Sequence, residues 1–317
     1  MQEGQLKNGG KDMTVTEARN ICRQFYKKTA PTEEDIFMFT EAMEYLITKT
    51  GDPNYMVDLG AMYYEQKRFD LALKYYEMAA ESDNIYAISN LGYIWYYGRT
   101  GTRDYEKAFY YFDKAAKMGD MIAAYKVADM YKNGYFVEKD REKYKRTIEE
   151  LYKKLKKNKY FRTNDPIPEI YTRLAAIRTE EGKTEEALAL YDVARDCLAQ
   201  RIKYNPFFGS LNIMKWMISD IYKLRAFNPE FMDLFDLYHV LKEPATAAFT
   251  CEGRSHAVEA VPEEDGIAIR FDDIWYRNVD DFFAKAKADG ELLTSIYEEL
   301  YDWEVNDGTD QNGQGKV

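Results

Sequence analysis

The feature that most constrains the fold is a set of residues that recurs 36 positions apart in the first half of the chain. Each set has small side chains at fixed places and keeps the three-to-four-residue spacing of one helix face. The earlier set is Ala87, Leu91, Gly92, Trp95 and Gly98, and the later set is Ala123, Val127, Ala128, Tyr131 and Gly134. A period of about 30–40 residues with small residues at fixed places is typical of stacked helix pairs.

A third, shorter unit precedes these two. Its first helix is marked by Leu59, Gly60 and Tyr63, and its second helix by Ala72, Tyr76 and Ala79. The equivalent of Ala79 in the next unit is Ala115, 36 residues later, whereas the equivalent of Leu59 is Leu91, only 32 residues later. The two offsets differ because the glycine turn Gly98–Thr102 adds four residues between the helices of the later unit. The small residues are expected where helices approach closely, since a larger side chain would cost roughly 1–3 kcal/mol of overpacking.

The units resemble Sel1-like repeats, which are relatives of the tetratricopeptide repeat. The residues that carry the resemblance are Leu91-Gly92, the glycine turn Gly98–Gly101, Asp104, Lys107-Ala108 and the pair Ala115-Ala116 before Gly119. Residues 168–199 resemble a tetratricopeptide repeat more closely. Tyr144 stands where Ala108 stands one unit earlier, so looser packing is expected there. The resemblance implies a superhelical scaffold that binds other proteins, whereas the spacing by itself implies only stacking.

The expected fold is therefore mainly α, an α/α superhelical solenoid of Sel1/TPR-like helix pairs with a small C-terminal α+β domain. The predicted divisions are a disordered tail at 1–12, an N-terminal helical hairpin at 13–51, the repeat array at 52–243, a small acidic α+β domain at 244–305 and a disordered tail at 306–317.

The C-terminal third shows a change of pattern. Phe207–Arg225 and Pro229–Leu241 are expected to form a last helix pair. Short extended runs follow at Ala247–Cys251, Ser255–Val261, Gly266–Phe271 and Ile274–Arg277, the first two joined by the hairpin signal Glu252-Gly253. Val279–Ala288 and Glu291–Trp303 are predicted as helices. Together these segments indicate an antiparallel meander with two helices packed on one face.

Charge and cysteine usage narrow the functional classes. From residue 244 onward the chain has 17 acidic and 6 basic residues, whereas the first 243 residues hold 38 of each sign. Such an acidic field repels phosphate backbones and attracts a basic partner.

Three widely spaced cysteines fit a reducing compartment. The N-terminal residues contain no apolar leader, and no run of about 18 apolar residues occurs, so a cytoplasmic protein without a membrane partner is expected.

No catalytic or metal-binding pattern stands out, and neither a cofactor nor a metal is predicted. The only histidines, His239 and His256, lack a matching cysteine or serine motif. The acidic turn Glu263-Glu264-Asp265 lacks the pattern of a calcium loop. The run Lys153–Lys157 fits the end of a solvated helix, with a nucleic-acid patch as the weaker alternative, and no nucleic-acid partner is predicted.

The residues expected to contact a partner lie on the first helix of two units. They do not belong to the apolar stripes and share one helix face. They are Asn90, Tyr93 and Tyr97 in the second unit, and Lys126, Asp129 and Asn133 in the third. Tyrosine suits an interface anchor, and asparagine or lysine can bind a peptide backbone or carboxylate. The plain alternative is ordinary exposed residues with two tyrosines stacked on a neighbour.

Three functional hypotheses follow from these patterns. The first is a non-enzymatic scaffold or adaptor that binds a protein or peptide on the concave face of the repeats. The alternative is an inhibitor or immunity-type protein whose acidic domain, residues 244–305, neutralises a basic partner. The third, an enzyme with its active site in the terminal domain, is disfavoured because the titratable groups it needs are missing.

Overall fold

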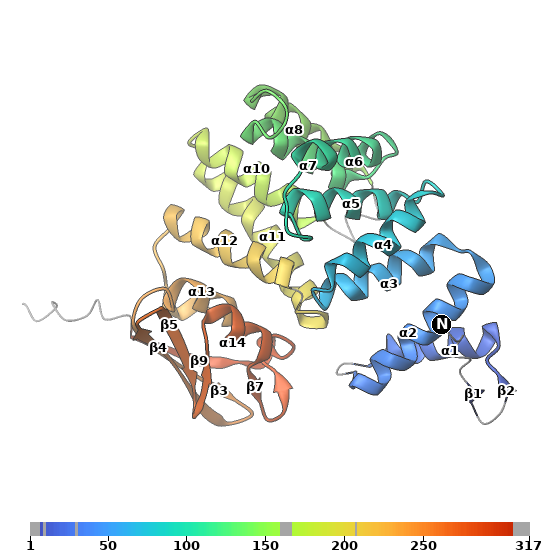
Figure 1. Ribbon diagram of the computed structural model, residues 1–317. Coiled ribbons are helices and arrows are strands. Elements are labelled where there is room, and N and C mark those ends of the chain that lie inside the picture. Colours follow the sequence, from blue (N-terminus) through green and yellow to red (C-terminus); the bar gives the residue numbers. More distant parts are fainter. Residues whose placement is uncertain (1–6, 9–10, 29–30, 159–166, 207, 307–317) are drawn as a thin grey trace, which may run out of the picture. The chain divides into compact units, whose positions relative to one another are not determined.

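The computed structural model describes residues 7–8, 11–28, 31–158, 167–206 and 208–306 (Figure 1). The chain divides into two compact units, Met1–Thr147 and Ile148–Val317. The first unit is built mainly from helices, and the second combines helices with an antiparallel sheet. The mainly helical fold with a C-terminal sheet confirms the predicted fold class.

The first unit begins with a short strand pair and a helical hairpin. Strands β1 (Lys7–Asn8) and β2 (Lys11–Asp12) pair antiparallel, and the rest of the tail predicted at 1–12 lies outside the described residues. Helix α1 (Val15–Phe25) starts with the capping box of Thr14 and Glu17. Helix α2 (Glu33–Thr50) has an equivalent box and ends at Gly51 in the left-handed conformation.

The repeat helices follow as successive antiparallel pairs. Their bounds are α3 (Pro53–Glu65), α4 (Phe69–Ala80), α5 (Ile85–Tyr97), α6 (Tyr105–Lys117), α7 (Met121–Asn133) and α8 (Arg141–Lys157). The side chains of Asp52, Asn84 and Asp120 cap the first helix of each pair. Helices α5 and α7 both end at a left-handed glycine, Gly98 and Gly134, so the 36-residue period is a repeat of backbone geometry.

The recurring small residues lie where helices touch. Leu91 and Ala115 are 1 % and 0 % exposed, which confirms that the predicted apolar faces are buried. A Cβ atom added to Gly92 would lie 2.5 Å from the Phe112 ring, so only glycine fits between α5 and α6. Tyr144, where looser packing was expected, is itself 1 % exposed and therefore lies inside the core.

The second unit begins at Ile148 within α8, and three further long helices follow. They are α10 (Pro168–Glu180), α11 (Thr184–Tyr204) and α12 (Phe208–Leu224). The pair α10–α11 occupies the stretch that resembles a tetratricopeptide repeat, and its small residues Ala175, Ala187 and Ala194 are fully buried. All three segments are therefore helical, as the sequence predicted.

The predicted helix at Pro229–Leu241 is wrong as a single element. The segment forms the short 3-10 turns η1 (Pro229–Phe231) and η2 (Leu234–Asp236), followed by one helical turn, α13 (Leu237–Val240). Asp233 caps η2 and its backbone N–H donates to the Asp236 carboxylate at 2.8 Å. This second capping box starts a new helix in the middle of the segment and so prevents a continuous one.

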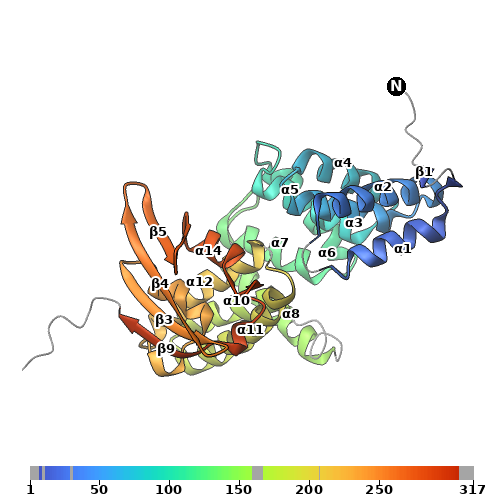
Figure 2. The ribbon, with the colours of Figure 1, turned by 90° about the horizontal axis from the view of Figure 1, so that it is seen from below.

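The sheet of the second unit has five antiparallel strands in the order β6-β5-β4-β3-β9 (Figure 2). The strands are β3 (Ala245–Cys251), β4 (Arg254–Glu263), β5 (Gly266–Phe271), β6 (Ile274–Tyr276) and β9 (Tyr301–Asn306). Glu252 and Gly253 both have positive φ at the β3–β4 turn, as the predicted two-residue hairpin requires. One face, which carries Phe271, packs against Phe282 of α14 (Val279–Lys285).

The predicted helix at Glu291–Trp303 is also wrong. The segment contains β8 (Glu291–Leu292), which pairs with β7 (Lys287–Ala288), then the 3-10 turn η3 (Tyr297–Glu299), and then β9. Strand β9 pairs with β3, and Trp303 packs against Phe249 with ring centroids 4.7 Å apart. Cross-strand pairing therefore overrides the local helical pattern, and α14 packs on the sheet without the second predicted helix.

Candidate functional site

The six predicted contact residues lie on α5 and α7, and the structure brings three of them together. Lys126 Nζ donates a hydrogen bond to Tyr97 Oη at 3.0 Å. Tyr93 stacks on Tyr97 with ring centroids 6.1 Å apart, and its hydroxyl lies 3.0 Å from the hydroxyl of Tyr125. The two tyrosines thus stack on each other, whereas the alternative predicted that they stack on a neighbour.

Lys126 is enclosed by aromatic rings. Its ammonium lies 5.1 to 5.6 Å from the ring centroids of Tyr93, Tyr96, Tyr97 and Tyr125. The side chain is only 6 % exposed, and the negative ring faces stabilise its charge in place of water. The expectation that Lys126 is free of packing contacts is therefore wrong.

Asp129 and the two asparagines have different surroundings. Asp129 is 9 % exposed, so it too departs from the expected exposed position. Asn133 is exposed, and its amide donates to the Asp129 backbone oxygen at 2.8 Å. Asn90 is half-buried on α5. Of the six residues, the structure therefore presents Tyr97, at 38 % exposure, and Asn133 as the most open side chains.

Arg99 extends this arrangement toward the preceding repeat. Its guanidinium lies 4.8 Å from the Tyr97 ring and 5.6 Å from the Tyr64 ring, and its Nε donates to Tyr64 Oη at 2.9 Å. We call Tyr64, Tyr93, Tyr96, Tyr97, Arg99, Tyr125 and Lys126 the tyrosine–cation cluster. It links α3, α5 and α7, with Tyr97 held between two cations.

Sequence reasoning missed Arg99, Tyr64, Tyr96 and Tyr125. Arg99 follows the left-handed Gly98, and its counterpart 36 residues later is Tyr135, so no repeat pattern marks it. A usable signal was the unusual tyrosine content, 28 residues in the chain, which suits helix seams that reach the surface.

Two tyrosines of the cluster, Tyr96 and Tyr64, have pKa values above the usual value. Burial raises the pKa of Tyr96, and the charge of Asp129 adds to this effect. Burial also raises the pKa of Tyr64, although the neighbouring Arg99 counteracts it. The cluster thus holds two cations, the enclosed Lys126 and the partly buried Arg99, among tyrosine rings.

The two histidines have structural surroundings. His239 packs against the rings of Tyr222 and Phe227, with centroids 4.4 and 5.5 Å away. His256 packs against Phe249 and Phe271, and its Nδ1 is 2.9 Å from the Asp272 carboxylate.

Across the residues that the structure describes, no three His, Cys, Asp or Glu side chains are grouped so as to hold a metal ion. Within the same residues, no helix combines the length and apolar character needed to cross a membrane.

Comparison with known proteins identifies the family of the repeats. A family model for the Sel1 repeat matches residues 53–84, 85–120 and 122–143. The structure is similar to that of a Sel1 repeat protein from Oxalobacter formigenes, with 20 % identity and a TM-score of 0.45 over 67 % of this chain and 80 % of that one.

It is also similar to c5321, described as a protective antigen of uropathogenic Escherichia coli with an SLR fold. That alignment has 15 % identity and a TM-score of 0.42 over 72 % of this chain and 52 % of that one, so this chain spans about half of its length. A comparison with curated protein sequences finds no match.

Proposed function

Because residues 53–143 carry three Sel1 repeats, we propose that this chain is a non-enzymatic scaffold that binds another protein through the face of α5 and α7. Sel1 repeats, like other stacked helix pairs, present extended surfaces that suit protein partners. The observation that carries the proposal is the exposed Tyr97 ring, which is held by Tyr93 of its own helix, by Lys126 of α7 and by Arg99 of the turn after α5.

Tyr97 is the proposed anchor. An aromatic side chain that is already immobilised loses little conformational entropy when a partner covers it. The hydrogen bond from Lys126 and the Arg99 guanidinium hold the ring from two sides. Lys126 and Asp129 are too buried for broad contact with a partner, so we assign them a positioning role. Asn90, Tyr93 and Asn133 are the proposed neighbouring contacts.

The chemistry of the surface suits a partner segment with a carboxylate or backbone carbonyls. Lys126 and Arg99 supply positive charge, while the tyrosine hydroxyls supply donors. A partner carboxylate beside Tyr97 would lie near Arg99, which is only partly buried, and would gain a charge-assisted hydrogen bond there.

The test is site-specific crosslinking. A photoreactive phenylalanine analogue is placed at position 97 in the full chain and, as a control, at position 110, because Tyr110 is 61 % exposed on α6. Irradiation in extract of the native cells should give a protein adduct from position 97 alone. Identical adducts from both positions, or an adduct from position 110 alone, would contradict the proposal.

The Kd for the captured partner then measures how much Tyr97 contributes to binding. Tyr97→Ala should weaken binding about tenfold or more, because aromatic anchors at interface centres typically contribute about 2 kcal/mol. Tyr110→Ala should leave the Kd within about twofold. Lys126→Met, which keeps the volume but removes the hydrogen bond to Tyr97, should give an intermediate loss if Lys126 positions the ring.

A further inference from the structure

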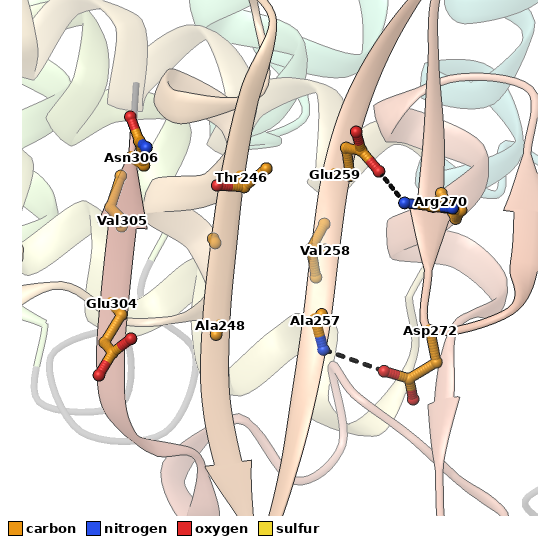
Figure 3. A pocket seen from close by; sticks show the side chains of 11 residues that line it. Thr246, Ala248, Ala257, Val258, Glu259, Arg270, Asp272, Glu304, Val305 and Asn306 are labelled. Carbon is orange, nitrogen blue, oxygen red and sulfur yellow. Dashed lines mark hydrogen bonds and ion pairs between the residues drawn. The ribbon is translucent and has the colours of Figure 1, made fainter. Parts of the chain in front are cut away.

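The second unit has a trough on the solvent-facing side of its sheet (Figure 3). The residues that line it follow the repeats in the sequence. The trough has a volume of about 520 Å³ and is lined by residues of β3, β4, β5 and β9. It lies on the face opposite to Phe249 and Phe271, because successive residues of a strand point to opposite faces.

The floor of the trough combines small side chains with Glu259, and further charged side chains stand at its two sides. Ala248 pairs with Ala257, and Thr246 with Glu259, in the central strands β3 and β4. Glu304 and Asn306 stand on β9 at one side, and Arg270 on β5 at the other (Figure 3). Three strand spacings separate β9 from β5, which is about 14 Å. An α-helix with its side chains is about 10–12 Å wide, so its diameter matches this width.

The backbone of the floor also favours a helix as occupant. Strand β3 pairs with both β4 and β9, and β4 pairs with both β3 and β5. Their backbone groups are therefore already used within the sheet. An extended peptide lying on this face would leave its own N–H and C=O groups without partners from the sheet, whereas a helix satisfies them internally.

The charges around the trough favour a basic occupant. Arg270 forms an ion pair with Glu259, and Asp272 accepts hydrogen bonds from His256 and from the Ala257 backbone N–H. Among the described residues the Glu304 carboxylate has no ion pair or hydrogen-bond partner. Residues 245–306 contain 15 acidic side chains against 5 basic ones, so this part of the chain has a net negative charge in addition to Glu304 in the trough.

An exposed aromatic ring borders the trough. Trp275 of β6 pairs with Arg270 across the sheet, and its side chain is 53 % exposed. The Arg270 guanidinium lies 5.9 Å from the Trp275 ring. Tryptophan at the rim of a concave acidic surface provides a face on which a partner's lysine or arginine can stack.

We propose that this trough binds a basic amphipathic helix of another protein, with its lysines or arginines directed at Glu304 and Trp275. The site is separate from the Tyr97 surface and goes beyond the function proposed above, since it adds a second contact of opposite charge preference. A chain with both sites would hold two partners, or two segments of one partner.

The test uses the full chain and a fluorescent, ~18-residue amphipathic peptide of leucine and lysine, which is ~27 Å long as a helix. Fluorescence anisotropy measures the Kd of this peptide and of a matched leucine–glutamate peptide. Glu304→Lys tests the charge, and Glu264→Lys in the exposed β4–β5 turn is its control with the same change of charge. Ala257→Tyr fills the floor, and Ser255→Tyr, two residues earlier on the same face, is the control for bulk.

The lysine peptide should bind and the glutamate peptide should not. Glu304→Lys and Ala257→Tyr should each weaken binding about fivefold or more, while both controls stay within about twofold. Equal losses for Glu304→Lys and Glu264→Lys would overturn the proposal, because binding would then follow net charge alone. Sedimentation of the chain without peptide gives a further check, since a dimer that Ala257→Tyr dissociates would make a second copy the occupant and overturn the proposal as well.

Tyr97→Ala separates the two sites. It should leave the Kd of the lysine peptide unchanged, because Tyr97 lies in the repeats and the trough lies in the sheet. If the photoreactive analogue at position 97 gives no protein adduct while the lysine peptide still binds the trough, only the proposed function is rejected. If position 97 gives an adduct but the lysine peptide does not bind, only the trough proposal is rejected.

Discussion

Two glycines in the repeats lie directly against aromatic rings, and each occupies the same place in its helix pair. A Cβ atom on Gly60 would lie 2.6 Å from the Tyr76 ring, and one on Gly92 would lie 2.5 Å from the Phe112 ring. Both rings are buried, with 2 % and 0 % exposure, so neither has open space into which it can move. The glycine thus sets how closely the two helices of a pair approach.

We predict that Gly92→Ala destabilises the chain. Alanine is favoured over glycine inside a helix by about 1 kcal/mol, but overpacking against Phe112 costs about 1–3 kcal/mol. Urea unfolding followed by circular dichroism should show a net loss of up to about 2 kcal/mol in the free energy of unfolding. Phe112→Leu in the Gly92→Ala background should restore part of this loss. A more stable Gly92→Ala variant would show that the ring can move aside.

At the scale of elements, local signals predicted helix starts and ends well. Thr14 with Glu17 predicts the start of α1, and Gly98 and Gly134 end α5 and α7 where the period places them. These signals act within one or two turns of the chain, so the sequence contains them. The strand β9 was missed because its stability comes from β3, about 50 residues earlier in the chain.

The candidate surface could be predicted only in part, for the same physical reason. Helical spacing places Tyr93 and Tyr97 on one face of α5, which the structure confirms. It does not show that the rings of α5 enclose Lys126 of the next repeat, because that depends on how the helices stack. Arg99 could not be found at all, since it lies in a turn where no periodicity applies.

The broken helix near residue 235 carries the most buried ion pair described in the second unit. Arg195 of α11 donates two hydrogen bonds to the Asp236 carboxylate, at 2.7 and 3.1 Å, and forms an ion pair with Asp233 at 2.7 Å. Tyr222 of α12 donates to the same Asp236 carboxylate at 2.6 Å. Asp236 is 0 % exposed, so these contacts connect three elements through one desolvated carboxylate.

We predict that Asp236→Ala lowers the free energy of unfolding by about 3–5 kcal/mol, because it leaves Arg195 as a buried charge with less compensation. Tyr222→Phe should cost about 1.5–3 kcal/mol, the usual range for a hydrogen bond to a charged group. The control is Asp220→Ala, whose ion pair with Lys223 is exposed and should contribute less than about 1 kcal/mol. Urea unfolding measures all three variants, and equal losses for Asp236→Ala and Asp220→Ala would contradict the prediction.

At the scale of the whole chain, charge is divided unevenly along the sequence. The formal net charge is −11, and residues 244–317 account for all of it, since the first 243 residues balance. The strongest basic run is Lys153–Lys157 in the last turns of α8, where Leu155 is buried and the lysines are exposed. Cations at a helix C-terminus are stabilised by the helix dipole, so this run has a structural reason to be there.

We therefore predict that the chain does not bind nucleic acid. Exposed lysines on one helix end release few counterions from a phosphate backbone, and the net charge of −11 opposes approach of a polyanion. An electrophoretic mobility assay with duplex DNA and single-stranded RNA at ~150 mM salt should show no complex up to ~10 µM protein, where nonspecific binders already associate. A complex that disappears in the charge-reversed variant Lys153→Glu/Lys154→Glu, but persists in Lys285→Glu/Lys287→Glu, would contradict this prediction and make the α8 terminus a phosphate-binding patch.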